Sequence, residues 1–449
     1  MFRKILIANR GEIALRVIRA CREMGIRSVI AHSEADRNSL PVRMADERIC
    51  IGPGQSGKSY LNIPNIISAA LISNADAIHP GYGFLSENTS FAEICNDVNM
   101  TFIGPSARVM TVMGDKVSAR EAMARAGLPM LPGTPVLRTF AEAEDAVREI
   151  GFPLMLKAVA GGGGRGIRLV KNPDEFERIF TLAQNEVREA FRDDGIYLER
   201  YLERARHIEI QVLVDNFGHG VHLGERNCSC QRRNQKVLEE SPTPVLPREL
   251  CEEIGMKAIQ AVQEVGYRNA GTLEFLVDEQ NRYYFMEMNT RLQVEHPVTE
   301  MVTSLDLVKE QIRIASGMPL QLQQEDVQLR GHSIECRITA EDAEADFRPQ
   351  TGVVEQYIVP GGPYVRVDSH LFVGYEVPPH YDSLLAKVIV WGENRNEAIA
   401  RMQRALDEFV IEGITTTIPF HQRLLKHEGF RRGETYTRFI QEEAIALGI

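Results

Sequence analysis

The chain has fewer basic than acidic residues and lacks any long apolar run. Lys and Arg number 51 and Asp and Glu 62, so the net charge is −11. This net charge disfavours nucleic-acid binding, which would require a local basic groove on an otherwise acidic protein. No window approaches the roughly 18 uninterrupted apolar residues of a membrane-spanning helix. The composition, 44% apolar and 25% charged, suits a folded chain, and 449 residues correspond to about three domains.

Cysteine is also scarce, and the seven residues are scattered along the chain in an odd number. This pattern excludes a disulfide scaffold and predicts reduced thiols. Cys228 and Cys230 are separated by one residue, but the sequence has no second such pair to complete a zinc site. The N-terminal sequence MFRKILIANRG has no apolar core of a signal peptide. We therefore expect a cytoplasmic protein that binds neither nucleic acid nor membranes.

The first hundred residues alternate β-prone runs with helical patterns. This alternation predicts a parallel sheet covered by helices. The expected strands are 4–9, 27–33, 47–51, 75–80 and 100–105.

The remainder is typical of an α+β arrangement. A helix over 116–126 and a proline-rich linker over 128–135 precede a compact unit, and a mixed sheet region begins at about residue 331. The helix in the compact unit is highly charged, which suits a mobile lid. The unit's elements are expected at 152–159, 167–170, 173–190 and 196–202, and a late helix at 396–410.

Residues 52–59, GPGQSGKS, match the phosphate-binding pattern G-x-x-x-x-G-K-[ST]. A working loop of this kind needs a helix starting at its lysine, whereas Pro64 and the β-prone residues 60–63 oppose one. We therefore expect an exposed glycine-rich loop here.

A second glycine run, 161–166, follows a strand that carries Lys157. Amide-rich glycine loops beside a lysine can clamp phosphates. The run can equally be the turn of a hairpin between 152–159 and 167–170. The two interpretations are compatible, because such a hairpin can close over a nucleotide.

The segment 271–289 predicts a β-hairpin with its turn near residue 280. In that register Glu274 and Glu287 face each other, and Asn289 lies on the same face as Glu287. Facing carboxylates repel unless a cation separates them, and oxygen ligands suit Mg²⁺ or Mn²⁺. The alternative is a solvated face with two unrelated glutamates.

Charged and amide groups follow the hairpin at alternating positions: Arg291, Gln293 and Glu295. In an extended segment they would share one side. Arginine suits an oxyanion such as bicarbonate, and a nearby glutamate can act as a base. An ion pair between Glu295 and Arg291 is the equally good alternative. A local basic patch is expected from Arg232, Arg233 and Lys236.

Several motifs together resemble the biotin carboxylases of biotin-dependent carboxylases, which have the ATP-grasp fold. They are KILIANRGEIA (4–14), HPGYGFLSEN (79–88), MGDK (113–116), GGGGRG (161–166), EMNTRLQVEHPVTE (287–300), HSIECRI (332–338) and HYDSLLAKV (380–388). The resemblance covers nearly the whole chain. It implies a Rossmann-like N-terminal domain over 1–113, an ATP-grasp domain over 114–330 with a mobile lid at about 131–203, and a C-terminal domain over 331–446.

The resemblance also implies a reaction and a site. ATP would phosphorylate bicarbonate to carboxyphosphate, whose CO₂ is captured by biotin. Nucleotide contacts would come from Lys116, Lys157, Gly163, Gly164, Glu199, Leu202, His207 and Asn234, with Glu274, Glu287 and Asn289 holding Mg²⁺ or Mn²⁺. Bicarbonate would contact Lys236, Arg291, Gln293 and Val294, Glu295 would deprotonate it, and Arg337 would stabilise the biotin enolate.

One departure from the family pattern is Asn234, where the family usually shows histidine. No biotin-attachment lysine flanked by methionines is found, so we expect biotin to arrive on a separate carrier protein and the carboxyltransferase to be a separate subunit. The resemblance also implies a homodimer. Acetyl-CoA carboxylase is the favoured system. The alternatives are a two-chain pyruvate or acyl-CoA carboxylase, an ATP-grasp ligase that does not use biotin, and a non-catalytic paralogue.

Overall fold

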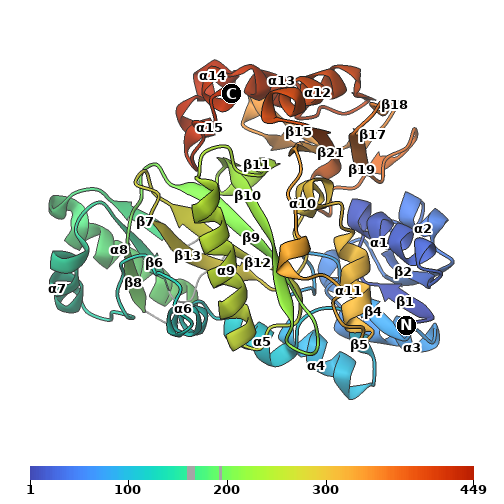
Figure 1. Ribbon diagram of the computed structural model, residues 1–449, viewed down its shortest axis with the longest axis horizontal. Coiled ribbons are helices and arrows are strands. Elements are labelled where there is room, and N and C mark those ends of the chain that lie inside the picture. Colours follow the sequence, from blue (N-terminus) through green and yellow to red (C-terminus); the bar gives the residue numbers. More distant parts are fainter. Residues whose placement is uncertain (159–166, 192–194) are drawn as a thin grey trace.

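The computed structural model describes residues 1–158, 167–191 and 195–449 (Figure 1). Its N-terminal part is a five-stranded sheet that is parallel, as predicted, and has the strand order β3-β2-β1-β4-β5. Ile5, Leu6 and Ile7 are all buried, because helices cover both faces of a parallel sheet. The elements are β1 Lys4–Ile7, α1 Gly11–Glu23, β2 Arg27–Ser33, α2 Leu40–Met44, β3 Glu47–Gly52, α3 Ile63–Ile72, β4 Ala77–His79, α4 Thr89–Asp97, β5 Thr101–Phe102 and α5 Ala107–Gly114.

The phosphate-loop look-alike at 52–59 does not open a helix at its lysine. Residues Ser56–Lys58 form a single 3₁₀ turn, and α3 begins only at Ile63. The side chain of Asn62 caps α3 by accepting from the amide of Asn65, and a proline occupies the first turn. This confirms the prediction that no helix starts at the lysine of this motif.

A small unit at the left of Figure 1 follows α6 (Lys116–Arg125). Strand β6 (Leu154–Ala158) pairs antiparallel with β7 (Ile167–Val170) and β8 (Ile196–Arg200), which confirms the hairpin prediction. Helices α7 (Phe140–Ile150) and α8 (Phe176–Phe191) complete it, and α8, expected to suit a lid better than a core, buries Phe176 and Phe180 in the unit's own core. Gly163 and Gly164 lie outside the described residues.

The proline-rich segment 128–135 links α6 to this unit but is not a free linker. The carbonyl of Pro129 accepts from the Phe285 amide, and the Thr134 amide donates to the carbonyl of Leu198. The segment is therefore held to the small unit and to the large sheet at once.

An antiparallel eight-stranded sheet forms the centre, in the order β13-β12-β9-β10-β11-β14-β21-β19. It continues across residue 330, because β11 pairs with β14 through Leu238 and Cys336. Its strands are β9 Arg206–Val214, β10 Gly220–Arg232, β11 Gln235–Ser241, β12 Asn269–Val277, β13 Tyr283–Asn289, β14 His332–Thr339, β19 Val365–Ser369 and β21 Leu384–Gly392. Helices α9 Arg248–Glu264, α10 His296–Thr303 and α11 Leu307–Ala315 are among those that pack against it.

The C-terminal helices pack against the end of this sheet, at the top of Figure 1. The helix predicted at 396–410 is confirmed as α12, Arg395–Glu408. The other C-terminal elements are α13 Ile418–Lys426, α14 Glu428–Arg431, α15 Phe439–Glu442, α16 Ala444–Leu447, β15 Glu341–Asp342, β16 Arg348–Pro349, β17 Gly352–Val353, β18 Gln356–Ile358, β20 Glu376–Val377 and β22 Val410–Glu412.

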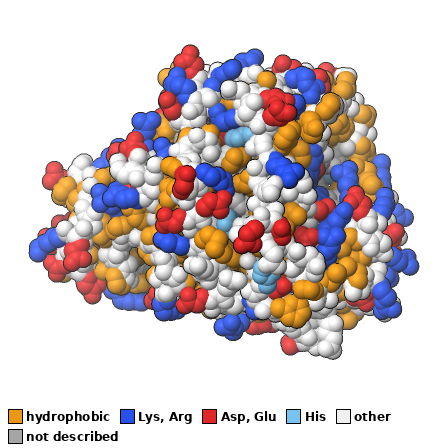
Figure 2. Space-filling model, in the orientation of Figure 1, with side chains coloured by type: hydrophobic (Ala, Val, Ile, Leu, Met, Phe, Trp, Pro, Cys, Tyr) orange, Lys and Arg blue, Asp and Glu red, His pale blue; other side chains and the backbone are white. Residues whose placement is uncertain are grey.

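Among the described residues, no helix is long and apolar enough to pass through a bilayer. Acidic and basic side chains are interspersed over the face shown in Figure 2.

Candidate active site

A cavity of about 1180 Å³ lies where the N-terminal sheet, the small unit and the large sheet meet. Tyr82, Lys157 and Arg337 reach it from these three parts. Every predicted site residue that the structure describes lines it: Lys116, Lys157, Glu199, Leu202, His207, Asn234, Lys236, Glu274, Glu287, Asn289, Arg291, Gln293, Val294, Glu295 and Arg337.

Two carboxylates face each other on the hairpin of β12 and β13. Glu274 pairs in register with Glu287, as predicted, and a bulge at Met286 shifts the register before Phe275 meets Phe285. The amide nitrogen of Asn289 donates to Glu274 Oε1 over 2.8 Å. The solvated alternative is wrong for Glu274, which is only 4% exposed and lines the cavity.

The two facing glutamates differ in electrostatic surroundings. Burial disfavours the charge on Glu274, but Lys236 and His207 outweigh it and lower the pKa of Glu274. The Glu287 side chain is exposed to the cavity, but the surrounding protein limits its hydration, and this and the Glu274 charge raise the pKa of Glu287. Within the described residues, no hydrogen-bond donor reaches the Glu287 carboxylate. A repelled and unpaired carboxylate beside a second one fits a divalent cation.

The amide oxygen of Asn289 does not point toward the place where a cation would lie between the two glutamates. Its amide oxygen accepts from Arg291 Nη2 over 3.0 Å, and its nitrogen faces Glu274. A half-turn of the amide would present oxygen to a cation beside the two glutamates.

Lys236, from β11, forms the centre of a buried cluster of three carboxylates. Its Nζ donates to Glu209 Oε2 at 2.6 Å, Glu274 Oε1 at 2.8 Å and Glu295 Oε1 at 2.7 Å. Burial opposes the charge, but the three carboxylates raise the pKa of Lys236 well above its ordinary value. His207, Glu209 and Glu274 lie close enough to share a metal ion, yet the Lys236 ammonium already provides positive charge among these oxygens.

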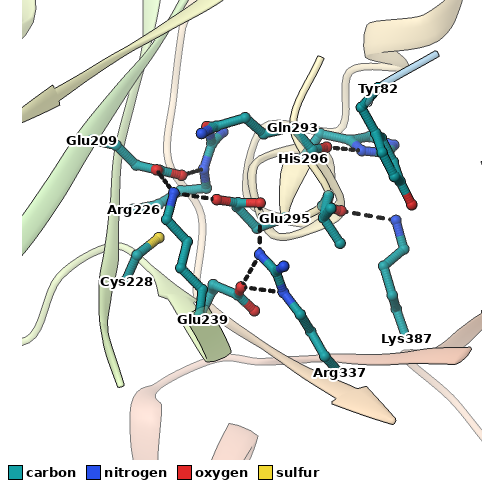
Figure 3. A network of polar contacts seen from close by, with 12 residues as sticks. Tyr82, Glu209, Arg226, Cys228, Glu239, Gln293, Glu295, His296, Arg337 and Lys387 are labelled. Carbon is teal, nitrogen blue, oxygen red and sulfur yellow. Dashed lines mark hydrogen bonds and ion pairs between the residues drawn. The ribbon is translucent and has the colours of Figure 1, made fainter. Parts of the chain in front are cut away.

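Glu295 precedes helix α10 and bridges two cations (Figure 3). One carboxylate oxygen accepts from Lys236, and Oε2 accepts from Arg337 Nη2 at 2.9 Å. Despite complete burial, these partners lower the pKa of Glu295 well below its ordinary value. The extended segment expected here is wrong, because a proline in the first turn of α10 favours a helix start at His296.

Arg291 does not pair with Glu295, so that alternative is wrong. Its Nε donates to Glu87 Oε2 at 2.9 Å, and the same carboxylate accepts from the amide of Thr290. Glu87 therefore fixes the segment that enters the site, and the sequence pattern gave no signal for it.

Arg337, from β14, also contacts Glu239. Its Nε donates to Glu239 Oε1 at 2.6 Å. Burial raises the pKa of Glu239, and the Arg337 charge opposes this while Glu295 adds to it, so that the value is about 7. Arg337 thus lies between two glutamates of different acidity (Figure 3).

Arg226 is a site residue that the sequence did not reveal. It is completely buried, and it donates to Glu209, to Gln211 Oε1 at 2.7 Å and to Gln293 Oε1 at 2.8 Å. Because the oxygen of Gln293 is taken, its nitrogen faces Glu274 Oε1 at 2.7 Å. A signal was present in β9, where polar Glu209 and Gln211 alternate with buried Ile and Val.

Among the residues expected to contact a nucleotide, Lys157 donates to Glu199, and Arg120 contacts the same carboxylate at 2.5 Å. His207 Nδ1 lies 2.8 Å from the amide nitrogen of Gln231, and its Nε2 lies 3.2 Å from Glu274. Arg120 was not predicted.

The backbone conformation at position 234 explains why asparagine is accommodated there. It forms with Arg233 the two-residue turn between β10 and β11, and both have positive φ, 64° and 49°. Asparagine tolerates this left-handed conformation better than most residues. The predicted basic patch is wrong, because Arg232 and Arg233 pair with Asp346 while Lys236 lies among carboxylates.

Three family models match the chain. "Biotin carboxylase, N-terminal domain" covers residues 1–110, "Carbamoyl-phosphate synthase L chain, ATP binding domain" covers 115–323, and "Biotin carboxylase C-terminal domain" covers 335–442. These matches confirm the resemblance and its ATP-grasp fold.

Similar curated proteins extend over nearly the full length. A biotin carboxylase of Nostoc sp. is 58% identical over 98% of this chain and 99% of its own. Biotin carboxylase 1 of Bacillus subtilis is 56% identical over 98% of both. A pyruvate carboxylase subunit of Methanothermobacter thermautotrophicus is 51% identical over 98% of this chain and 90% of its own.

A similar solved structure is the biotin carboxylase domain dimer of 2-oxoglutarate carboxylase from Hydrogenobacter thermophilus, in complex with MgADP, ADP and bicarbonate. Its TM-score is 0.93 at 49% identity, covering 100% of this chain and 99% of that chain.

Proposed function

The chain belongs to the biotin carboxylase family of ATP-dependent ligases, and we propose that it catalyses the first half-reaction of an acetyl-CoA carboxylase. In that reaction ATP, bicarbonate and biotin on a carrier protein give ADP, phosphate and carboxybiotin. The observation that carries this proposal is Glu295 held between Lys236 and Arg337, beside the facing glutamates. Family membership sets aside a ligase that does not use biotin.

The nucleotide half of the site would bind and orient the phosphates. Lys116 and Lys157 line the cavity and supply positive charge near Glu199, Leu202 and His207. Glu274, Glu287 and Asn289 would hold Mg²⁺ or Mn²⁺, which neutralises charge on the transferred phosphoryl group when bound. Asn234 borders the same space, and the lid glycines Gly163 and Gly164 complete the proposed nucleotide contacts.

The other half would bind bicarbonate and remove its proton. Lys236, Arg291, Gln293 and the backbone of Val294 would hold the anion, with Glu295 as base. In the structure Glu295 is a weak base, because two cations hold it ionised. A bound anion would compete for those cations and so raise the pKa of Glu295. The base would therefore become competent only when its substrate is present.

Arg337 would then act on biotin. Its guanidinium lines the cavity and donates to Glu239 and Glu295. A fixed guanidinium stabilises the negative oxygen that develops when the ureido nitrogen loses its proton. The released CO₂ would be captured in the same cavity.

We also propose the division into 1–113, 114–330 and 331–446, which the family-model matches support. The expected partners are a biotin carboxyl carrier protein, a carboxyltransferase and a second copy of the chain. The dimer named for the Hydrogenobacter domain supports the last of these. Dependence on ATP favours a cytoplasmic location.

The final acceptor is the part of the proposal that needs its own test. The 51% identity to a pyruvate carboxylase subunit makes pyruvate a second candidate, and 2-oxoglutarate is a third. The tagged chain would be purified from its source with its associated proteins and supplied with ATP and labelled bicarbonate. Label fixed with acetyl-CoA supports the proposal, whereas label fixed only with pyruvate or 2-oxoglutarate overturns the choice of acceptor.

A further inference from the structure

Lys387 is a completely buried lysine outside the proposed substrate contacts. It belongs to β21, and its Nζ donates to the carbonyl of Val294 at 2.8 Å (Figure 3). The same ammonium lies 3.1 Å from Glu12 Oε1, on helix α1. One side chain thus joins helix α1, the large sheet and the segment that carries Glu295.

We propose that Lys387 is a positioning residue that fixes the Val294–Glu295 peptide and thereby the place where bicarbonate meets its base. The inference rests on the proposed function. Lys387 does not line the cavity, whereas Val294 and Glu295 both do. It would therefore act through them and not on the substrate itself.

The peptide geometry explains how one hydrogen bond can fix both residues. The carbonyl of Val294 and the amide of Glu295 belong to one planar unit. Holding the carbonyl oxygen therefore restricts both flanking Cα atoms. The side chain of Glu295 must span from there to Lys236 and Arg337, at 2.7 and 2.9 Å.

Burying an ammonium group costs desolvation free energy, so its presence in the interior argues for a specific role. Burial without partners strongly disfavours a charged amine, and an apolar side chain would pack at lower cost. Lys387 is surrounded by the acidic groups of Glu12, Glu335 and Asp368. The first of these also accepts from the hydroxyl of Tyr82, which lines the cavity. The chain Tyr82–Glu12–Lys387–Val294 therefore connects two parts of the cavity wall.

The test separates positioning from charge balance. Lys387→Met keeps the length of the side chain and removes its charge and donor. We expect the KM for bicarbonate to rise about ten- to a hundredfold, the range for losing a hydrogen bond from a charged group, with the KM for ATP within about twofold. Glu12→Gln removes one partner of the ammonium but leaves its bond to Val294, so the bicarbonate KM should rise less than in Lys387→Met.

The double variant Lys387→Met with Glu12→Gln decides between the two roles. It removes both partners of the Lys387–Glu12 ion pair, so thermal unfolding should lie closer to the wild-type temperature than in Lys387→Met while the KM for bicarbonate stays high. Recovery of that KM, an equal rise in the KM for ATP, or failure of the double variant to fold would each overturn the inference. Absence of bicarbonate-dependent turnover in the wild type would instead overturn the proposed function, and this inference with it.

Discussion

Glu274 and Glu287 lie directly opposite each other on adjacent antiparallel strands, and only the first has hydrogen-bond partners among the described residues. The Glu287 carboxylate, which has no such partner among the described residues, is the one that a divalent cation would bind. We predict that Glu287→Gln lowers ATP turnover at least about a hundredfold, as expected for losing preorganised charge at a phosphoryl-transfer site.

Glu279→Gln is the matched control for this variant, since it lies at the exposed turn of the same hairpin. Its turnover should equal that of the wild type in a coupled ADP-release assay. Wild-type turnover by Glu287→Gln would remove this residue from the metal site.

Metal removal tests the same pair without substitution. Chelation of divalent cations should abolish turnover, and added Mg²⁺ or Mn²⁺ should restore it, because both accept all-oxygen ligands. Titration of activity against free metal gives the apparent affinity, which Glu287→Gln should weaken. Turnover that persists at full rate after exhaustive chelation would contradict the assignment.

Glu239 gives the site a predicted pH dependence. Its pKa of about 7 means that the carboxyl loses its proton as the pH rises through neutrality. Once ionised it holds the Arg337 guanidinium more firmly, so biotin-dependent turnover should rise through about pH 7. Glu239→Gln stays neutral and should show no such rise, measured as ADP release with free biotin between pH 6 and about 8.5. An unchanged inflection in this variant would assign the titration to another group.

Glu335 predicts a pH dependence of stability. Both of its carboxylate oxygens are buried without a hydrogen-bond partner, and burial raises its pKa well above the ordinary value. The folded protein therefore keeps this proton where the unfolded chain has lost it. That stabilisation is complete below about pH 4.3 and is lost as the pH rises toward the folded pKa, by about 1.4 kcal/mol per pH unit.

Glu335→Gln carries no titrating group at this position. Its unfolding temperature should therefore gain on that of the wild type as the pH rises from about 6 to 8. Glu325→Gln, at an exposed position, should track the wild type across the same range. A constant difference between Glu335→Gln and wild type would show that Glu335 keeps the same protonation on unfolding.

The sequence predicted the features that depend on neighbouring residues. The hairpin of Glu274 and Glu287 follows from local alternation and a turn, and the structure confirms its register. The alternation of polar residues predicts an extended segment up to Glu295, but the effect of Pro297 on helix initiation outweighs it. Arg232 and Lys236 were grouped because they are close in sequence, but the turn between them sends them to different partners.

Other contacts could not be predicted from the sequence, because they join residues that are far apart along the chain. Arg226 meets Gln293 and Lys387 meets Val294 across 67 and 93 positions of the chain. Only the order of strands in the large sheet brings these groups together. The resemblance supplied the proposed roles, and the structure supplied the residues that hold them in place.

The measurement that tests the account most directly is ADP release by the purified chain with ATP and Mg²⁺, with and without bicarbonate and free biotin. The account predicts a rise in turnover that requires both bicarbonate and biotin, and that Glu295→Gln abolishes. Nucleotide binding without such turnover, or turnover indifferent to bicarbonate, would contradict it.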